Sequence, residues 1–157
     1  MDAPDVAVIS FGFSVRPDQG ESSGYDLGDM LVGGDEGAID SSGHRPDQGM
    51  MIYLSVPMLL DGFQGFAEGA ARTWVFYGVD TSYTPAFHRR KTGVLVRGRD
   101  ARPGAASLPD MAGSLLAATE DFVRSDFSRL PADDIAWHDL NLSLTAFRGF
   151  VGRLSRD

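Results

Sequence analysis

The residues best suited to acid–base chemistry surround the first of three histidines, in the polar run His44-Arg45-Pro46-Asp47-Gln48. A histidine acts as a general base when a carboxylate orients its ring, and Asp47 stands three residues from His44. Tyr53 follows in an apolar stretch and adds a hydroxyl. These three residues are the candidate catalytic group. The competing interpretation is a loop histidine that faces water and has no catalytic role.

A basic run accompanies the second histidine, in His88-Arg89-Arg90-Lys91. Guanidinium and ammonium groups bind phosphate and carboxylate, so the run predicts an anion-binding site. Two alternatives stay open: a solvated hairpin, or a segment that neutralises an acidic surface of the same chain. The third histidine, His138, adjoins an aspartate, but neighbours in sequence do not face each other on a helix and form no ready-made dyad.

The sequence gives little support to a metal or cofactor site. No two histidines have metal-ligand spacing, and the absence of cysteine excludes disulfides, thiolate zinc sites and a thiol nucleophile. The segment from Gly33 to Asp40 has the composition of a calcium loop without the ligand order of an EF-hand. Phosphate loops, dinucleotide fingerprints, nucleophile elbows and zinc-protease helices are absent from the sequence. We therefore expect no metal and no cofactor.

The net charge of −8 lies in the first third of the chain. Residues 1–50 contain ten Asp or Glu and two arginines, whereas residues 51–157 contain twelve acidic and twelve basic residues. An acidic field disfavours nucleic acid and anionic lipid as partners and favours a basic protein. The acidic cluster, defined as Asp35, Glu36 and Asp40, is the predicted partner-binding group. The alternative is that the charge serves only solubility.

Strands that would position these groups are predicted from alternation and from apolar runs. Residues 5–15 alternate between apolar and small polar side chains, which indicates a half-buried strand. Residues 16–49 hold eight glycines and eight acidic residues, so we expect a long loop there, pinned by a short strand or turn at 27–32. The continuous apolar run 50–56 predicts a central strand covered on both faces.

Later strands are expected at 73–79 and in a hairpin over 86–98 that turns at Lys91-Thr92-Gly93. Alternation in its second arm places two valines inward and Arg97 and Arg99 outward. A loop is expected over 99–106.

Three helices are predicted. The first spans 57–70 and carries three glycines on one side, which would let a neighbouring backbone approach. The second spans 107–129, with Ser107 as its N-cap. The third starts near Asn141 and buries a stripe that includes Phe147. Strands followed by two helices indicate an α+β fold: a mixed or antiparallel sheet of four to five strands with two to three helices packed on one face.

One pentapeptide occurs twice, as Arg16-Pro17-Asp18-Gln19-Gly20 and as Arg45-Pro46-Asp47-Gln48-Gly49. The first copy follows the strand at 5–15 and the second precedes the apolar run 50–56. If those strands pair, the copies lie at related edges of the sheet. Five residues without surrounding similarity make no repeat architecture, so we interpret the copies as two Pro-Asp turns.

Length and composition indicate one globular domain over 1–157. The acidic start does not match a signal peptide, and no apolar stretch approaches the roughly 20 residues of a membrane span, so we expect a cytoplasmic protein. The favoured function is a non-enzymatic protein-binding module, such as a small antagonist or immunity-type protein that masks a basic partner. The alternative is a small enzyme or ligand-binding domain with a pocket under the 16–49 loop.

Overall fold

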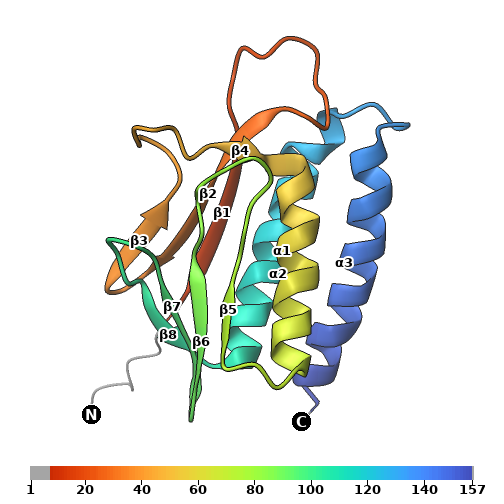
Figure 1. The fold of residues 1–157 in the computed structure, drawn as a ribbon. Coiled ribbons are helices and arrows are strands. Elements are labelled where there is room, and N and C mark those ends of the chain that lie inside the picture. Colours follow the sequence, from red (N-terminus) through yellow and green to blue (C-terminus); the bar gives the residue numbers. More distant parts are fainter. Residues whose placement is uncertain (1–7, 157) are drawn as a thin grey trace, which may run out of the picture.

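The computed structural model describes residues 8–156, which form two four-stranded antiparallel sheets and three helices (Figure 1). The first sheet contains β1 (Ser10–Val15), β2 (Leu27–Gly34), β3 (Gly37–Asp40) and β4 (Met50–Met51). The second contains β5 (Thr73–Val75), β6 (Ala86–Arg90), β7 (Gly93–Arg97) and β8 (Gly104–Ala106). The helices are α1 (Ile52–Glu68), α2 (Leu108–Ser125) and α3 (Ile135–Leu154), with a 3₁₀ turn at Phe127–Arg129.

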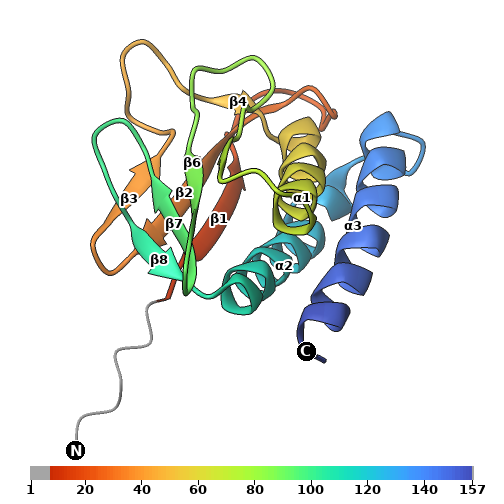
Figure 2. The same ribbon diagram turned by 60° about the horizontal axis from the view of Figure 1, so that its bottom comes forward.

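Strand β2 is the centre of the first sheet. It pairs with β1 along one edge and with β3 and β4 along the other, whereas the second sheet runs in the order β5-β6-β7-β8. Two views show the three helices together on one side of the strands (Figure 1 and Figure 2). The predicted α+β class with antiparallel pairing is confirmed. The strands divide into two sheets, and the 86–98 hairpin pairs with β5 on one side and β8 on the other.

The buried side chains of both sheets and all three helices form one cluster, with α1 at its centre. Phe63 of α1 is fully buried, and its ring lies 6.0–6.5 Å from four aromatic rings, which belong to Trp74, Phe87, Phe147 and Phe150. Edge-to-face pairs at these distances add to the stabilisation from burial alone. Phe63 and these four rings therefore pack the helix layer against the second sheet.

The expectation of a loop over 16–49 is wrong for its middle, because 27–34 and 37–40 are strands β2 and β3. The short element expected at 27–32 is the start of a full central strand. Gly28, Met30 and Val32 face inward, and both apolar side chains are fully buried. A side chain on Gly28 would collide with Ile52 at the start of α1. Glycine at position 28 therefore lets β2 and α1 pack closely. The same glycine interrupts the alternation of apolar and polar side chains from which a strand is predicted.

The expectation of a central strand over 50–56 is also wrong. Only Met50 and Met51 pair with β2, and α1 begins at Ile52, five residues before Pro57. A continuous apolar run fits a buried helix as well as a buried strand. Most residues in the first turns of α1 are apolar and buried, and the buried Ser55 hydroxyl donates to the carbonyl oxygen of Met51.

Other boundaries differ by a few residues. Strand β5 ends at Val75, the expected loop over 99–106 contains β8, and α3 begins at Ile135 because Asp134 caps it. Residues 5–7 of the first predicted strand lie outside the described residues. The hairpin turn at 91–93 and the cap of α2 are confirmed, since the Ser107 side chain accepts a hydrogen bond from the Asp110 amide.

The glycines of α1 have different surroundings. A side chain on Gly62 would collide with the indole of Trp74, whereas one on Gly65 would meet open space. The close neighbour of this helix face is therefore an aromatic side chain, and the expectation that a backbone approaches is wrong at Gly62.

Candidate functional site

The structure does not bring the candidate catalytic residues together. His44 Nε2–H donates to the carbonyl oxygen of Asp40 at 2.7 Å. The Asp47 carboxylate accepts hydrogen bonds of 2.7 and 2.8 Å from the two terminal nitrogens of Arg16. A carboxylate orients a general base only by a direct hydrogen bond to its ring, and Asp47 makes its bonds elsewhere.

Tyr53 points into the helix layer. Its hydroxyl donates to the carbonyl oxygen of Asp126 at 3.1 Å, and its ring packs between Phe122 and Phe127. Burial raises the pKa of Tyr53 to about 12, so the hydroxyl stays protonated at neutral pH. Tyr53 has the contacts of a core residue with a satisfied polar group.

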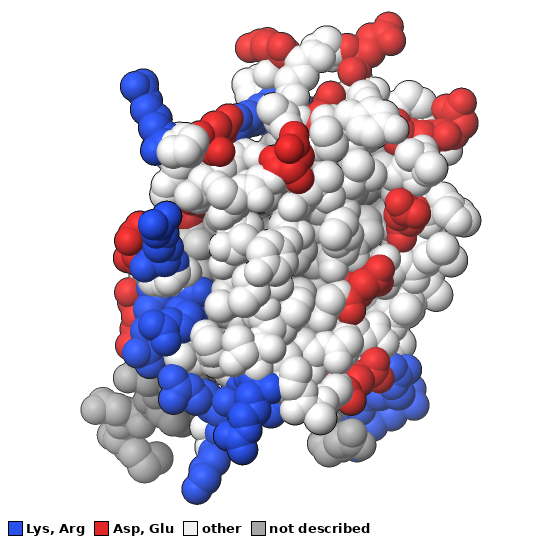
Figure 3. Space-filling model, in the orientation of Figure 1, with Lys and Arg blue, Asp and Glu red and all other residues white. Residues whose placement is uncertain are grey.

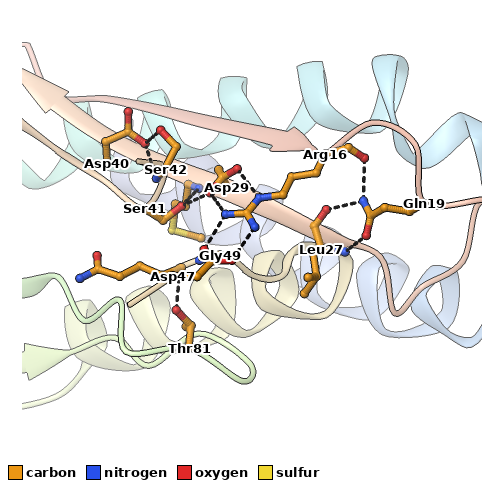
Figure 4. Close-up of polar contacts among 12 residues, drawn as sticks. Arg16, Gln19, Leu27, Asp29, Asp40, Ser41, Ser42, Asp47, Gly49 and Thr81 are labelled. Carbon is orange, nitrogen blue, oxygen red and sulfur yellow. Dashed lines mark hydrogen bonds and ion pairs between the residues drawn. The ribbon is translucent and has the colours of Figure 1, made fainter. Parts of the chain in front are cut away.

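Arg16 joins the two copies of the pentapeptide (Figure 4). Its guanidinium binds Asp47 of the second copy and also binds both carboxylate oxygens of Asp29 on β2 at 3.0 Å. These hydrogen bonds lower the pKa of Asp29 and of Asp47 below the usual range. Ser41 adds a hydrogen bond of 2.8 Å to Asp29. We call Arg16, Asp29 and Asp47 the arginine clamp.

The copies differ in what they contact. β1 and β4 do not pair with each other; they flank β2, and both copies lie at the same end of it. Gly49 of the second copy leaves the space that the Arg16 guanidinium fills. Arg45, the counterpart of Arg16, is exposed and forms no ion pair among residues 8–156.

The acidic cluster is divided between two places. Asp35 and Glu36 form the turn between β2 and β3, where the Glu36 amide donates to the carbonyl oxygen of Pro103 at 3.1 Å. Asp40 ends β3, and its carboxylate accepts hydrogen bonds from the amide and hydroxyl of Ser42. The turn therefore packs beside the basic loop before β8, which weakens its field.

The basic run 88–91 is also divided, because successive residues of β6 face opposite sides of the sheet. The Arg89 guanidinium donates to carbonyl oxygens at the end of α1, including that of Phe66 at 2.6 Å, and lies 4.9 Å from the Phe66 ring centroid. It serves as a cap for this helix end. Arg90 and Lys91 are exposed at the hairpin end.

His88 instead lines a pocket of about 470 Å³ on the outer face of the second sheet, together with Arg97 and Arg99. Arg97 lies opposite Ala86, the residue two positions before His88, so the imidazole and this guanidinium are diagonal neighbours on adjacent strands. Alternation predicts that both arginines point outward, but the hairpin register is needed to place Arg97 beside His88, and Arg99 follows as another lining residue of the pocket.

The His88 side chain is held in a defined position. Its Nδ1 lies 3.2 Å from the Thr73 hydroxyl, and its Nε2 is buried without a hydrogen-bond partner among the described residues. Burial, with a smaller effect of Arg97 and Arg90, lowers the pKa of His88. The imidazole is therefore neutral at pH 7.

A second surface feature is an apolar groove of about 380 Å³ where the start of α1 faces α3. Leu142 and Met58 contribute exposed apolar side chains, with 63% and 48% of their surface accessible. Exposed Asp61 and Asp139 also line the groove, and neither forms an ion pair within residues 8–156. We call this feature the helix groove. Sequence reasoning missed it because the pairing of α1 with α3 joins segments about 80 residues apart.

The charged side chains are segregated over the surface. Most acidic side chains lie along the top and on the flank formed by α1 and α3, and basic ones gather at the lower left over β6 to β8, with a smaller basic group at the lower right (Figure 3). Half of the chain's basic residues fall within 72–102, against two aspartates: Arg72, Arg89, Arg90, Lys91, Arg97, Arg99 and Arg102. The summed charge therefore hides a basic face.

In the described part of the chain, no helix is long and apolar enough to cross a membrane. Within residues 8–156 no three His, Asp or Glu side chains gather closely enough to hold a metal ion. Comparisons with protein families, with curated proteins and with solved structures find no match to this chain.

Proposed function

We propose that this chain is a non-enzymatic protein-binding module that masks a basic partner, as a small cytoplasmic antagonist or immunity-type protein would. The helix groove is the observation that carries the proposal. It combines exposed apolar side chains with carboxylates that form no ion pair among residues 8–156, which suits a partner segment whose apolar residues are flanked by Lys or Arg.

The helix groove supports docking better than the acidic cluster does. Two members of the cluster form a tight turn that packs on the loop at 102–104, whereas the carboxylates of Asp61 and Asp139 border an apolar surface. The acidic cluster remains a candidate for steering the partner by long-range charge, because steering needs no contact.

A pull-down from the native cell, with two variants of the chain as baits, tests this proposal. Leu142→Ser removes an apolar side chain from the groove, and Ile135→Ser is its control, since Ile135 lies on the same helix with the same 63% exposure. We expect the unaltered chain and Ile135→Ser to retain a basic protein from the native cell, and Leu142→Ser to lose it. Retention of the same proteins by both variants, or of no basic protein, would contradict the proposal.

A ligand-binding domain is the second candidate function. The pocket beside His88 favours it, because Ile39 and Gln48 of segment 16–49 form part of its wall. No catalytic step is proposed for this pocket.

A further inference from the structure

The pocket beside His88 has walls that are fixed before any ligand arrives. The buried Tyr83 hydroxyl donates to the carbonyl oxygen of Ile39 at 2.7 Å, and the Thr81 hydroxyl donates to that of Gln48 at 2.6 Å. These bonds tie the loop before β6 to β3 and to the segment before β4. A rigid wall lowers the ordering cost that a ligand must overcome.

The junction between the two sheets forms another part of the wall. Ile39 of β3 packs directly over Gly98, where an added side chain would lie 3.0 Å from Ile39 Cγ1. Ala86 stands opposite Arg97 and fills little space. Ile39 fills the space beside Gly98, whereas the small side chain of Ala86 leaves room beneath Arg97.

The charges that line this pocket have no ion-pair partner among residues 8–156. Arg97 and Arg99 are exposed and form no ion pair or side-chain hydrogen bond within the described part of the chain. None of the described residues that line the pocket is Asp or Glu, whereas Ser82 and Thr84 add hydroxyls. Guanidinium forks beside hydroxyl donors match the geometry of a phosphate group.

We propose that this pocket binds a small phosphorylated molecule, with Arg97 and Arg99 holding its phosphate and His88 beside it. A volume of about 470 Å³ lies in the usual range for small-molecule sites and exceeds the needs of a lone phosphate ion. The remaining part of the ligand lies against Ile39, Val75 and Tyr83. The site is separate from the helix groove and does not depend on the proposed protein partner.

The probes are inorganic phosphate and phenyl phosphate, measured by calorimetry on the intact chain. The pocket variant is Arg97→Gln with Arg99→Gln, and the control is Arg90→Gln with Lys91→Gln, which removes equal charge from the same hairpin outside the pocket. We expect phenyl phosphate to bind more tightly than inorganic phosphate. We also expect the pocket variant to bind it about tenfold or more weakly and the control within about twofold.

His88 supplies an independent readout. A bound phosphate offsets the charge of the neighbouring arginines, so phenyl phosphate should raise the pKa of His88 in an NMR titration of the unaltered chain. The same addition should leave the pKa of His88 unchanged in the pocket variant.

Three results would overturn the proposal: no binding of either probe at millimolar concentration, equal weakening in both variants, or no response of His88. A single-stranded oligonucleotide is a further arm. If it binds more tightly than phenyl phosphate and both variants weaken it equally, the basic face is a nucleic-acid surface and the pocket is not a ligand site.

Discussion

Replacing Arg16 by Gln is expected to lower the free energy of unfolding by about 2–3 kcal/mol. The magnitude comes from Asp29, whose side chain is only 15% exposed and accepts two bonds of 3.0 Å from Arg16. Hydrogen bonds to charged groups contribute about 1.5–3 kcal/mol, and a half-buried carboxylate left without its cation adds a desolvation cost. The contact with Asp47 is exposed and adds little.

Urea unfolding followed by tryptophan fluorescence measures this change. Arg45→Gln is the matched control, because it makes the same substitution at the same pentapeptide position without breaking an ion pair, and it should cost less than about 0.5 kcal/mol. Asp29→Asn removes the carboxylate charge that Arg16→Gln leaves without a partner. The double variant Arg16→Gln/Asp29→Asn should therefore lose less free energy of unfolding than the two single variants lose in sum. Equal effects at positions 16 and 45 would refute the argument.

The arginine clamp also predicts how stability depends on pH. Its hydrogen bonds lower the pKa of Asp29 and Asp47 in the folded chain, so the unfolded chain takes up these protons at higher pH. The contribution is fully present above the unfolded value of about 3.9 and is lost as the pH falls through the lower folded values. Arg16→Gln should therefore lose less stability than the unaltered chain between about pH 5 and pH 2.

Three further outcomes are expected. Phe147→Ala should lower the free energy of unfolding in urea by about 3–5 kcal/mol, because Phe147 is fully buried against Phe63. Leu142→Ala on the same helix should lower it by less than about 1 kcal/mol, and similar losses in the two variants would contradict the packing of α3. In hydrogen exchange, amides of β2 should be protected as strongly as those of α2, and fast exchange throughout 16–49 would contradict the central position of β2. Neutralising the acidic cluster to Asn or Gln should slow association with a basic partner several-fold at low salt and leave the melting temperature nearly unchanged; a stability loss without a rate loss would end its steering role.

The sequence predicts elements well where side chains alternate or recur at helical spacing. The hairpin over 86–98 and the capped helix α2 follow from such patterns, and both are confirmed. Prediction fails at β2, where glycines occupy inward positions, and at Ile52, where an apolar run fits helix and strand equally. In both cases tertiary packing determines the secondary structure, and the hydropathy pattern carries no information about that packing.

The candidate sites differ in how far sequence reaches them. The sequence predicts His88 as a candidate residue and Arg97 as an outward-facing one. A hairpin turn at 91–93 then fixes the register of the two strands that carry them. The arginine clamp is harder to foresee, because identical pentapeptides carry no sign of which arginine binds which aspartate. Only the strand order around β2 places Arg16 beside Asp47 and leaves Arg45 in solvent.

The seam between the β2–β3 turn and the loop before β8 determines where foreign sequence can be inserted. A side chain on Gly34 would collide with the Pro103 carbonyl, and one on Gly104 would lie 2.9 Å from the Glu36 carboxylate. These short turns cover each other, so a tag placed in either would push the two sheets apart. Gly20 and Gly43 have positive φ angles and open space around them. An epitope or fluorophore inserted after either glycine should leave the fold intact.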